Sequence, residues 1–317
     1  MITKTRLAFG LLSVFALVAT LEAAEYETII ERGPHHQVRR SVTAEIANGV
    51  AVLRTNSFTV LRNGMHRLEN GVWVDASPNL QIVDGTSIRG TGASYTIELG
   101  SNLLAEDAIR VTTPDGQLLA AHPIALMLFD PTSGKSICVS TVQDCFPQIV
   151  SSNIVVYKNA FTCGDIRLTY AAGSFEQDVI LKQNIDPASF GMDQTARIEV
   201  WTEFSQSPSF KKTQMRVGAE IDPVRRAQMA EPDVIEEKID FGKVQLIAGR
   251  AFPANGSAGS VFVAKRWMQI DGKSVLVESA TVQIFPEQRM RPLGPQFTTP
   301  SGLRLIRARW KAITRLR

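Results

Sequence analysis

The alternation of apolar and polar positions is clearest between residues 153 and 183, where two short alternating runs flank a Gly-bearing connection. A period of two is typical of half-buried strands, and the connection Ala171-Ala172-Gly173-Ser174 predicts a β-hairpin. One face of this hairpin carries large apolar side chains: Ile166, Leu168, Tyr170, Phe175, Val179 and Leu181.

Symmetric closure of this hairpin puts Tyr170 opposite Phe175 and Arg167 opposite Asp178. Cross-strand pairs of these kinds each stabilise a sheet by about 0.2–1 kcal/mol. Arg167, Asp178 and the neighbouring Glu176 fall on the face away from the apolar side chains. We therefore expect a solvated ion pair there, and a structural role for all of these residues.

From residue 49 onward, short strand-like runs alternate with turn signals. The strongest turn signals are Asn63-Gly64, Asn70-Gly71, Asp84-Gly85, Pro114-Asp115-Gly116 and Asp271-Gly272. Regular spacing of this kind predicts a mainly β fold, with large antiparallel sheets packed as a β-sandwich. Little helix is expected outside the two ends of the chain.

Residues 1–24 resemble a secretory signal peptide, with Lys4 and Arg6 before the apolar run Leu7–Leu21 and small residues after it. The alternative is an N-terminal membrane anchor, but the run is short for a bilayer span of about 20 residues. We expect cleavage, and hence a secreted protein or one in the periplasm or on the cell surface.

The rest of the chain divides by composition into an extended lead-in, a β-rich domain, a proline-rich linker and a basic tail: residues 25–48, 49–285, 286–301 and 302–317. The β-rich part is either one domain or two packed sub-domains with a boundary near 205–238. That boundary stretch is rich in proline and charge. It predicts either an excursion from the sheet or a short helix near Val224–Met229.

The tail carries apolar residues at helical spacing among bases: Leu303, Ile306, Trp310 and Ile313. A basic amphipathic helix of this kind can lie on an anionic membrane surface. The alternative, which we favour, is a terminus without such a function.

The formal net charge of +3 comes from the two ends of the chain. Without the leader and the tail, 26 basic side chains stand against 30 acidic ones. The body is therefore mildly acidic, which gives nucleic-acid binding no electrostatic basis.

Three cysteines are present, and Cys138 and Cys145 are spaced to bridge a short hairpin loop in an oxidising compartment. The alternative is three free thiols, with Cys163 unpaired in both cases. The histidines His35, His36, His66 and His122 lack the spacing of zinc ligands. We expect neither a metal nor another cofactor.

Candidate chemistry is sparse, because the sequence contains no nucleophile elbow, zinc-protease, P-loop or dinucleotide-binding motif. Two of the acids Asp165, Glu176 and Asp178 could serve as the carboxylate pair of a glycosidase, but their placement on the hairpin favours a structural role. Trp73 and Trp201 lie in strand-like runs and could stack on sugars, although strand tryptophans mostly pack in cores.

Several segments together resemble the N-terminal region of large secreted bacterial proteins, often followed by Rhs/YD repeats or other surface modules. The matching segments include Gly71-Val72-Trp73-Val74-Asp75, Thr113-Pro114-Asp115-Gly116, Val156–Phe161, Asp165–Tyr170 and Gly173–Leu181. The resemblance spans roughly residues 65–290 and implies an exported β module without a catalytic signature.

The function we expect is a non-catalytic scaffolding or binding part of a larger surface or secreted protein. Its partners would be a cell-surface polymer or downstream modules. The alternatives are a carbohydrate-binding module and an enzyme that acts on polysaccharide.

Overall fold

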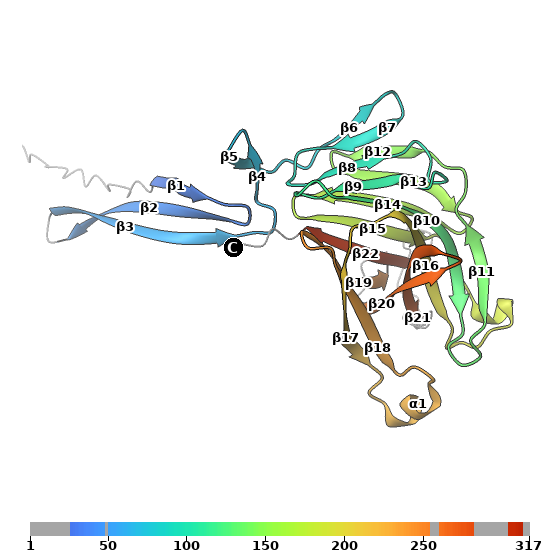
Figure 1. The fold of residues 1–317 in the computed structure, drawn as a ribbon. Coiled ribbons are helices and arrows are strands. Elements are labelled where there is room, and N and C mark those ends of the chain that lie inside the picture. Colours follow the sequence, from blue (N-terminus) through green and yellow to red (C-terminus); the bar gives the residue numbers. More distant parts are fainter. Residues whose placement is uncertain (1–25, 48–49, 254–259, 282–303, 313–317) are drawn as a thin grey trace, which may run out of the picture. The chain divides into compact units, whose positions relative to one another are not determined.

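The computed structural model describes residues 26–47, 50–253, 260–281 and 304–312, the last of these through the backbone only. Strands dominate this part of the chain (Figure 1), and its helical elements are the 3-10 turn η1 (Pro187–Phe190) and the short helix α1 (Pro223–Gln228). Nearly all of the strand pairs are antiparallel. The prediction of a mainly β, antiparallel fold is confirmed. The expected signal peptide and the proline-rich linker lie outside the described residues.

The chain divides into two compact units, and the smaller one is built on a three-stranded sheet in the order β1-β2-β3. Its strands are β1 (Tyr26–Arg32), β2 (His36–Ala47) and β3 (Val50–Leu61). Within residues 25–48, expected as an extended lead-in, Tyr26–Arg32 and His36–Ala47 therefore form paired strands. The larger unit comprises residues 32–37 and 61–317. A division of the β-rich part near 205–238 stays a prediction.

The first strands of the larger unit are short and joined by tight turns. Strands β4 (His66–Glu69) and β5 (Val72–Asp75) pair with each other. A meander follows, in which each strand pairs with the next: β6 (Leu80–Val83), β7 (Ser87–Gly90), β8 (Thr96–Leu99) and β9 (Ile109–Thr112). The expected turns are present, with positive φ at Gly64, Gly71 and Gly85, a conformation that glycine adopts without strain.

The long strand β10 (Leu118–Phe129) joins the parts of the main sheet. One of its edges pairs with β9 and then with β11 (Ser136–Thr141), while the other pairs with β16 (Arg197–Gln206). From β16 the sheet continues through β21 (Lys273–Thr281), β20 (Val261–Ile270) and β19 (Val244–Pro253).

The other arm of this sheet comprises β12 (Pro147–Ser151), β13 (Ile154–Phe161), β14 (Gly164–Ala171) and β15 (Ser174–Leu181), each paired with the next. The predicted hairpin is formed by β14 and β15. Strand β22 (Arg304–Ala312) lies between β15 and β19 and closes the sheet on itself. A further hairpin, β17 (Lys211–Ala219) and β18 (Asp233–Asp240), carries α1 in its connection (Figure 1).

The central hairpin has the register that the alternation predicts, with Tyr170 opposite Phe175 and Arg167 opposite Asp178. Both aromatic residues are buried in the main core. The Tyr170 hydroxyl donates to the carbonyl of Tyr95 (2.9 Å) and accepts from the backbone N–H of Ala93 (2.9 Å). These two hydrogen bonds tie the hairpin to the chain around β8.

The expectation of a solvated polar face on this hairpin was wrong. Asp178 is fully buried and Glu176 nearly so, whereas the Arg167 side chain keeps 28% of its exposure. β22 pairs along the whole of β15, so the hairpin lies inside the sheet and not at its edge. Arg167 donates two hydrogen bonds to Asp178 Oδ2, at 3.0 and 2.6 Å.

The amphipathic helix considered for the tail is not present in residues 304–312, which form β22. The same residues alternate between apolar and basic with a period of two from Ile306 onward. Two open strand edges, on β15 and β19, supply backbone partners for this strand on both sides. Pairing of the backbone therefore outweighed the helical spacing.

Candidate functional site

The candidate site lies beside the β17–β18 hairpin, whose connection is shaped by local capping. Asp222 precedes Pro223, and its side chain accepts hydrogen bonds from the backbone N–H groups of Val224 (2.8 Å) and Arg225 (3.2 Å). Aspartate at the N-cap and proline at the first helical position both favour a helix start. The helix predicted near Val224–Met229 is thus present as α1, within an excursion from the sheet.

Two cavities open between this hairpin and the sheet. The first has a volume of about 500 Å³, and its walls include Glu220 and Arg225 on the hairpin side and Phe262 on the sheet side. The second has a volume of about 400 Å³ and extends to Gln214 and Arg266. Both are lined by Arg197, Glu231, Pro232, Ala264 and Ser279, so the two adjoin. We call them together the hairpin cleft.

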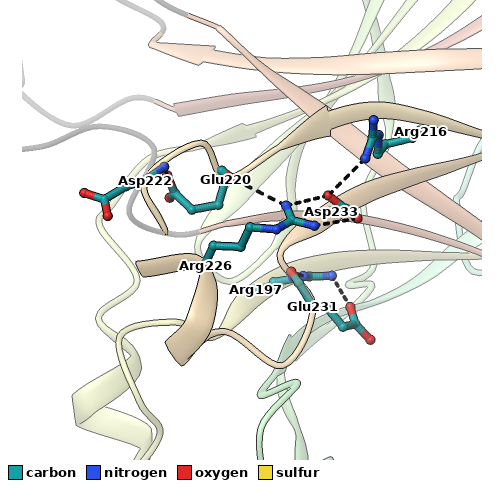
Figure 2. A network of polar contacts seen from close by, with 7 residues as sticks. All are labelled: Arg197, Arg216, Glu220, Asp222, Arg226, Glu231 and Asp233. Atoms are coloured by element: carbon teal, nitrogen blue, oxygen red, sulfur yellow. Dashed lines mark hydrogen bonds and ion pairs between the residues drawn. The ribbon is translucent and has the colours of Figure 1, made fainter. Parts of the chain in front are cut away.

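An ion pair stands where the two cavities meet (Figure 2). Arg197 Nη1 donates to Glu231 Oε2 (2.5 Å), and Arg197 Nη2 donates to the Glu231 backbone carbonyl (3.0 Å). Arg197 comes from the start of β16 and its side chain is only 10% exposed, whereas Glu231 lies just before β18 and is 44% exposed. The pair links the sheet to the hairpin connection and presents its carboxylate to solvent.

A second group of charges holds the base of α1 (Figure 2). Arg226 donates to both carboxylate oxygens of Asp233, at 2.8 and 3.1 Å, and Arg216 lies 3.9 Å from the same carboxylate. Arg225 lies 3.5 Å from Glu220, whose Oε1 also accepts from the backbone N–H of Asp222 (3.0 Å). Two-pronged arginine–carboxylate contacts fix geometry as well as charge.

Asp233 is held in its ionised form by Arg226. The hydrogen bonds from Arg226 lower the pKa of Asp233, and the same contact raises the pKa of Arg226. A general acid must instead hold a proton near the working pH. Asp233 is therefore suited to holding a binding surface in shape and not to donating a proton.

Further into the sheet, Glu199 is an acid in a different environment. It accepts hydrogen bonds from Trp201 Nε1 (2.9 Å) and Arg266 Nη2 (2.8 Å), and burial raises its pKa although both partners act in the opposite direction. Only 1% of Glu199 is exposed, so a polymeric substrate has no access to it. Its contacts fix Arg266, which lines the second cavity.

The residues singled out from the sequence do not gather at this cleft. Arg167, Tyr170, Phe175 and Asp178 form the buried hairpin described above, and none of them lines either cavity. Asp165 pairs with Lys182 (2.5 Å) at the other end of that hairpin.

The possible disulfide between Cys138 and Cys145 is not formed, and all three cysteines are free thiols. Cys138 lies on β11 and is exposed, whereas Cys145 belongs to the buried core. Because the two thiols occupy different environments, spacing along the chain did not bring them together. Burial raises the pKa of the Cys145 and Cys163 thiols.

The two tryptophans considered as a sugar platform belong to separate sheets. Trp73 is in β5 and Trp201 is in β16, where its indole N–H is engaged by Glu199. In the part of the chain that the structure describes, no group of three His, Cys, Asp or Glu side chains is arranged to hold a metal ion. None of the helices in these residues is both long and apolar enough to span a membrane.

Comparisons with family models, with curated proteins and with solved structures gave no match for this chain. The resemblance of residues 65–290 to Rhs-associated proteins therefore stays a prediction. The sequence analysis missed the cleft, although a signal was present. The segment 220–233 sets two arginines between acids and contains the Asp-Pro start of a helix.

Proposed function

We propose that this protein is a non-catalytic β module of an exported bacterial surface or secreted protein, and that it binds its partner through the hairpin cleft. The observation that carries this proposal is the set of arginine–carboxylate pairs along the cleft, Arg197–Glu231 and Arg226–Asp233. These pairs hold polar groups in fixed positions. Such a surface suits recognition better than turnover.

The partner class that fits is an extended polar polymer of the cell surface. The cleft is open along two adjoining cavities, and its charges alternate in sign, so it offers both donors and acceptors to a neutral or zwitterionic chain. Export is supported by the signal-like residues 1–24. An association with Rhs-type repeats is supported by the segment resemblance alone.

The proposal extends to a sandwich arrangement of the main sheet, with its two arms packed face to face. Supporting this, the Nε2 of the buried Gln177 on β15 donates to Thr202 Oγ1 on β16 (3.3 Å), although β15 and β16 do not pair with each other. A crystal structure in which these two strands are far apart would contradict the sandwich.

The binding test uses a glycan array together with a panel of purified cell-surface polymers, probed with the protein and with two variants. Arg226→Ala removes the two-pronged contact that holds Asp233 in the wall of the second cavity, and it should weaken binding because this wall then loses its fixed geometry. Arg89→Ala is the matched control, since Arg89 forms an exposed pair with Glu98 (2.8 Å) on β7 and β8.

The same polymers are screened for hydrolysis. Binding that depends on Arg226 but not on Arg89, without turnover, supports the proposal. Turnover that disappears in Glu231→Gln or Asp233→Asn would show a polysaccharide-acting enzyme instead. If Arg226→Ala leaves binding unaffected, the partner does not bind in the hairpin cleft.

A further inference from the structure

Three charged side chains meet inside the protein on three neighbouring strands. Lys265 on β20 lies opposite Glu278 on β21, and it also pairs with Glu236 on β18 at the single parallel bridge between β18 and β20. All three are almost completely buried, with 1% of Lys265 and 2% of each glutamate exposed. Charged groups are rarely buried unless their partners satisfy them fully.

The contacts of this buried trio are incomplete for an ion pair. Lys265 Nζ donates to Glu236 Oε1 and to the backbone carbonyl of Ile247. The other carboxylate oxygen, Glu236 Oε2, is buried and has no hydrogen-bond partner among the described residues. Burial of an ion pair that is not fully hydrogen-bonded costs more than it returns.

Burial also favours uncharged forms of the two acids. It raises the pKa of Glu236, and it raises the pKa of Glu278 to about 7, although Lys265 acts in the opposite direction on both. Glu278 therefore holds a proton over much of the range below neutral pH. The site combines an amine, a carboxyl group in contact with it, and a second carboxyl group that can hold and release a proton.

We propose that Lys265 and Glu236 form an intramolecular isopeptide bond, with Glu278 acting as the proton carrier. The ammonium of Lys265 passes a proton to the carboxylate of Glu236, which leaves a neutral amine beside a neutral acid. Nζ attacks Cδ of Glu236, and a bond forms between them. The second proton of the nitrogen passes through Glu278 to the departing hydroxyl, which leaves as water. One amide and one water replace the ammonium and the carboxylate, and no oxidant or reductant is needed.

The structure favours this condensation for two reasons. The reacting groups are held in contact by paired strands, which gives an intramolecular reaction a large advantage. The reacting side chains are also almost completely buried, which disfavours the ionised reactants. The amide product keeps one N–H, and this can still donate to the Ile247 carbonyl.

The bond would tie β18 to β20 across a loop of 29 residues. A cross-link of this kind restricts the unfolded chain in the way that a disulfide does, but it does not depend on redox conditions. It would hold the strand that leads into the hairpin cleft against the sheet. Lys265 also lines the second cavity of the hairpin cleft, but the inference does not rest on the proposed function, because the cross-link needs no partner.

The primary test is the mass of the purified full chain in its denatured state. Wild type should be lighter by one water molecule than its sequence requires, whereas Lys265→Met, with the same termini, should have its full calculated mass. After trypsin, a branched peptide should join residues 227–238 to residues 251–266, because an acylated Lys265 is not cleaved. Fragmentation should place the branch at Glu236. A wild-type protein of full mass overturns the proposal.

Two further comparisons sharpen the test. Glu278→Gln keeps both reacting groups but cannot carry the proton, so it should fold with its full mass or react much more slowly than wild type. Lys273 is an internal control, since it pairs with Glu203 (2.8 Å) while 55% exposed, and it should remain unmodified. A branch at Glu278 would contradict the assignment of Glu236 as the acyl partner. Normal cross-linking in Glu278→Gln would show that Glu278 does not carry the proton.

Discussion

The hydroxyl group of Tyr170 offers a sharp test of how the central hairpin is anchored. Tyr170→Phe keeps the buried ring and its edge-on contact with Tyr95, whose centroid lies 5.2 Å away. It removes only the hydroxyl, which leaves the N–H of Ala93 and the carbonyl of Tyr95 without this partner. The effect therefore isolates two hydrogen bonds from the packing of the ring.

The expected magnitude follows from the number of buried groups left unpaired. Each such group costs about 1–3 kcal/mol, and a carbonyl costs less than an N–H, so Tyr170→Phe should lose about 2–4 kcal/mol of unfolding free energy. Tyr157→Phe is the matched variant. Tyr157 is equally buried, but its hydroxyl donates only to the Gly100 carbonyl (2.7 Å), so a loss of about 1–2 kcal/mol is expected.

The assay is urea unfolding followed by circular dichroism, with the midpoint compared at an unchanged slope. Tyr170→Ala should cost more than Tyr170→Phe, because truncation also leaves a cavity. Its total cost should be about 3–5 kcal/mol or more. If Tyr170→Phe proves no more destabilising than Tyr157→Phe, the hydroxyl of Tyr170 does not anchor the hairpin to β8.

Three other outcomes are expected. Arg167→Ala should cost about 1.5–3 kcal/mol in the same urea assay, because it withdraws two hydrogen bonds from the buried Asp178. Gly92→Ala should prevent stable folding, since an added Cβ would lie 1.6 Å from the backbone oxygen of Ser77. The pKa of the Glu278 carboxyl is about 7 in the folded protein, against an ordinary value of 4.5 in the unfolded chain. Stability should therefore fall as the pH rises from about 4.5 to 7, and Glu278→Gln should flatten this slope.

The first two of these outcomes have a control in the same chain. Arg89→Ala breaks an exposed ion pair and should cost less than about 1 kcal/mol. Gly85 has φ of +75° and nothing within 4 Å of its added Cβ, so Gly85→Ala should cost only about 1–2 kcal/mol of backbone strain. Equal costs for Arg167→Ala and Arg89→Ala would mean that Asp178 is not buried in solution. A pH slope unchanged by Glu278→Gln would assign the titration to another group.

The local pattern of the sequence determined the strands, the turns and the register of the central hairpin. A period of two and a Gly-bearing connection are properties of neighbouring residues, so Tyr170 and Phe175 could be paired without knowing the rest of the fold. The start of α1 at Asp222-Pro223 was readable for the same reason, since a cap acts within one turn.

Only the tertiary structure decided what covers each face. Asp178 is fully buried although it lies on the polar face of the hairpin, and alternation within the hairpin carries no information on what packs against that face. The neighbour of β15 was equally hidden, because β22 lies more than 120 residues further along the chain. Lys265, Glu236 and Glu278 meet only because β18 and β20 form a parallel bridge while β20 pairs with β21. Pairing between distant strands depends on the whole sheet, whereas a hydrophobic pattern reports only which side of one strand faces inward.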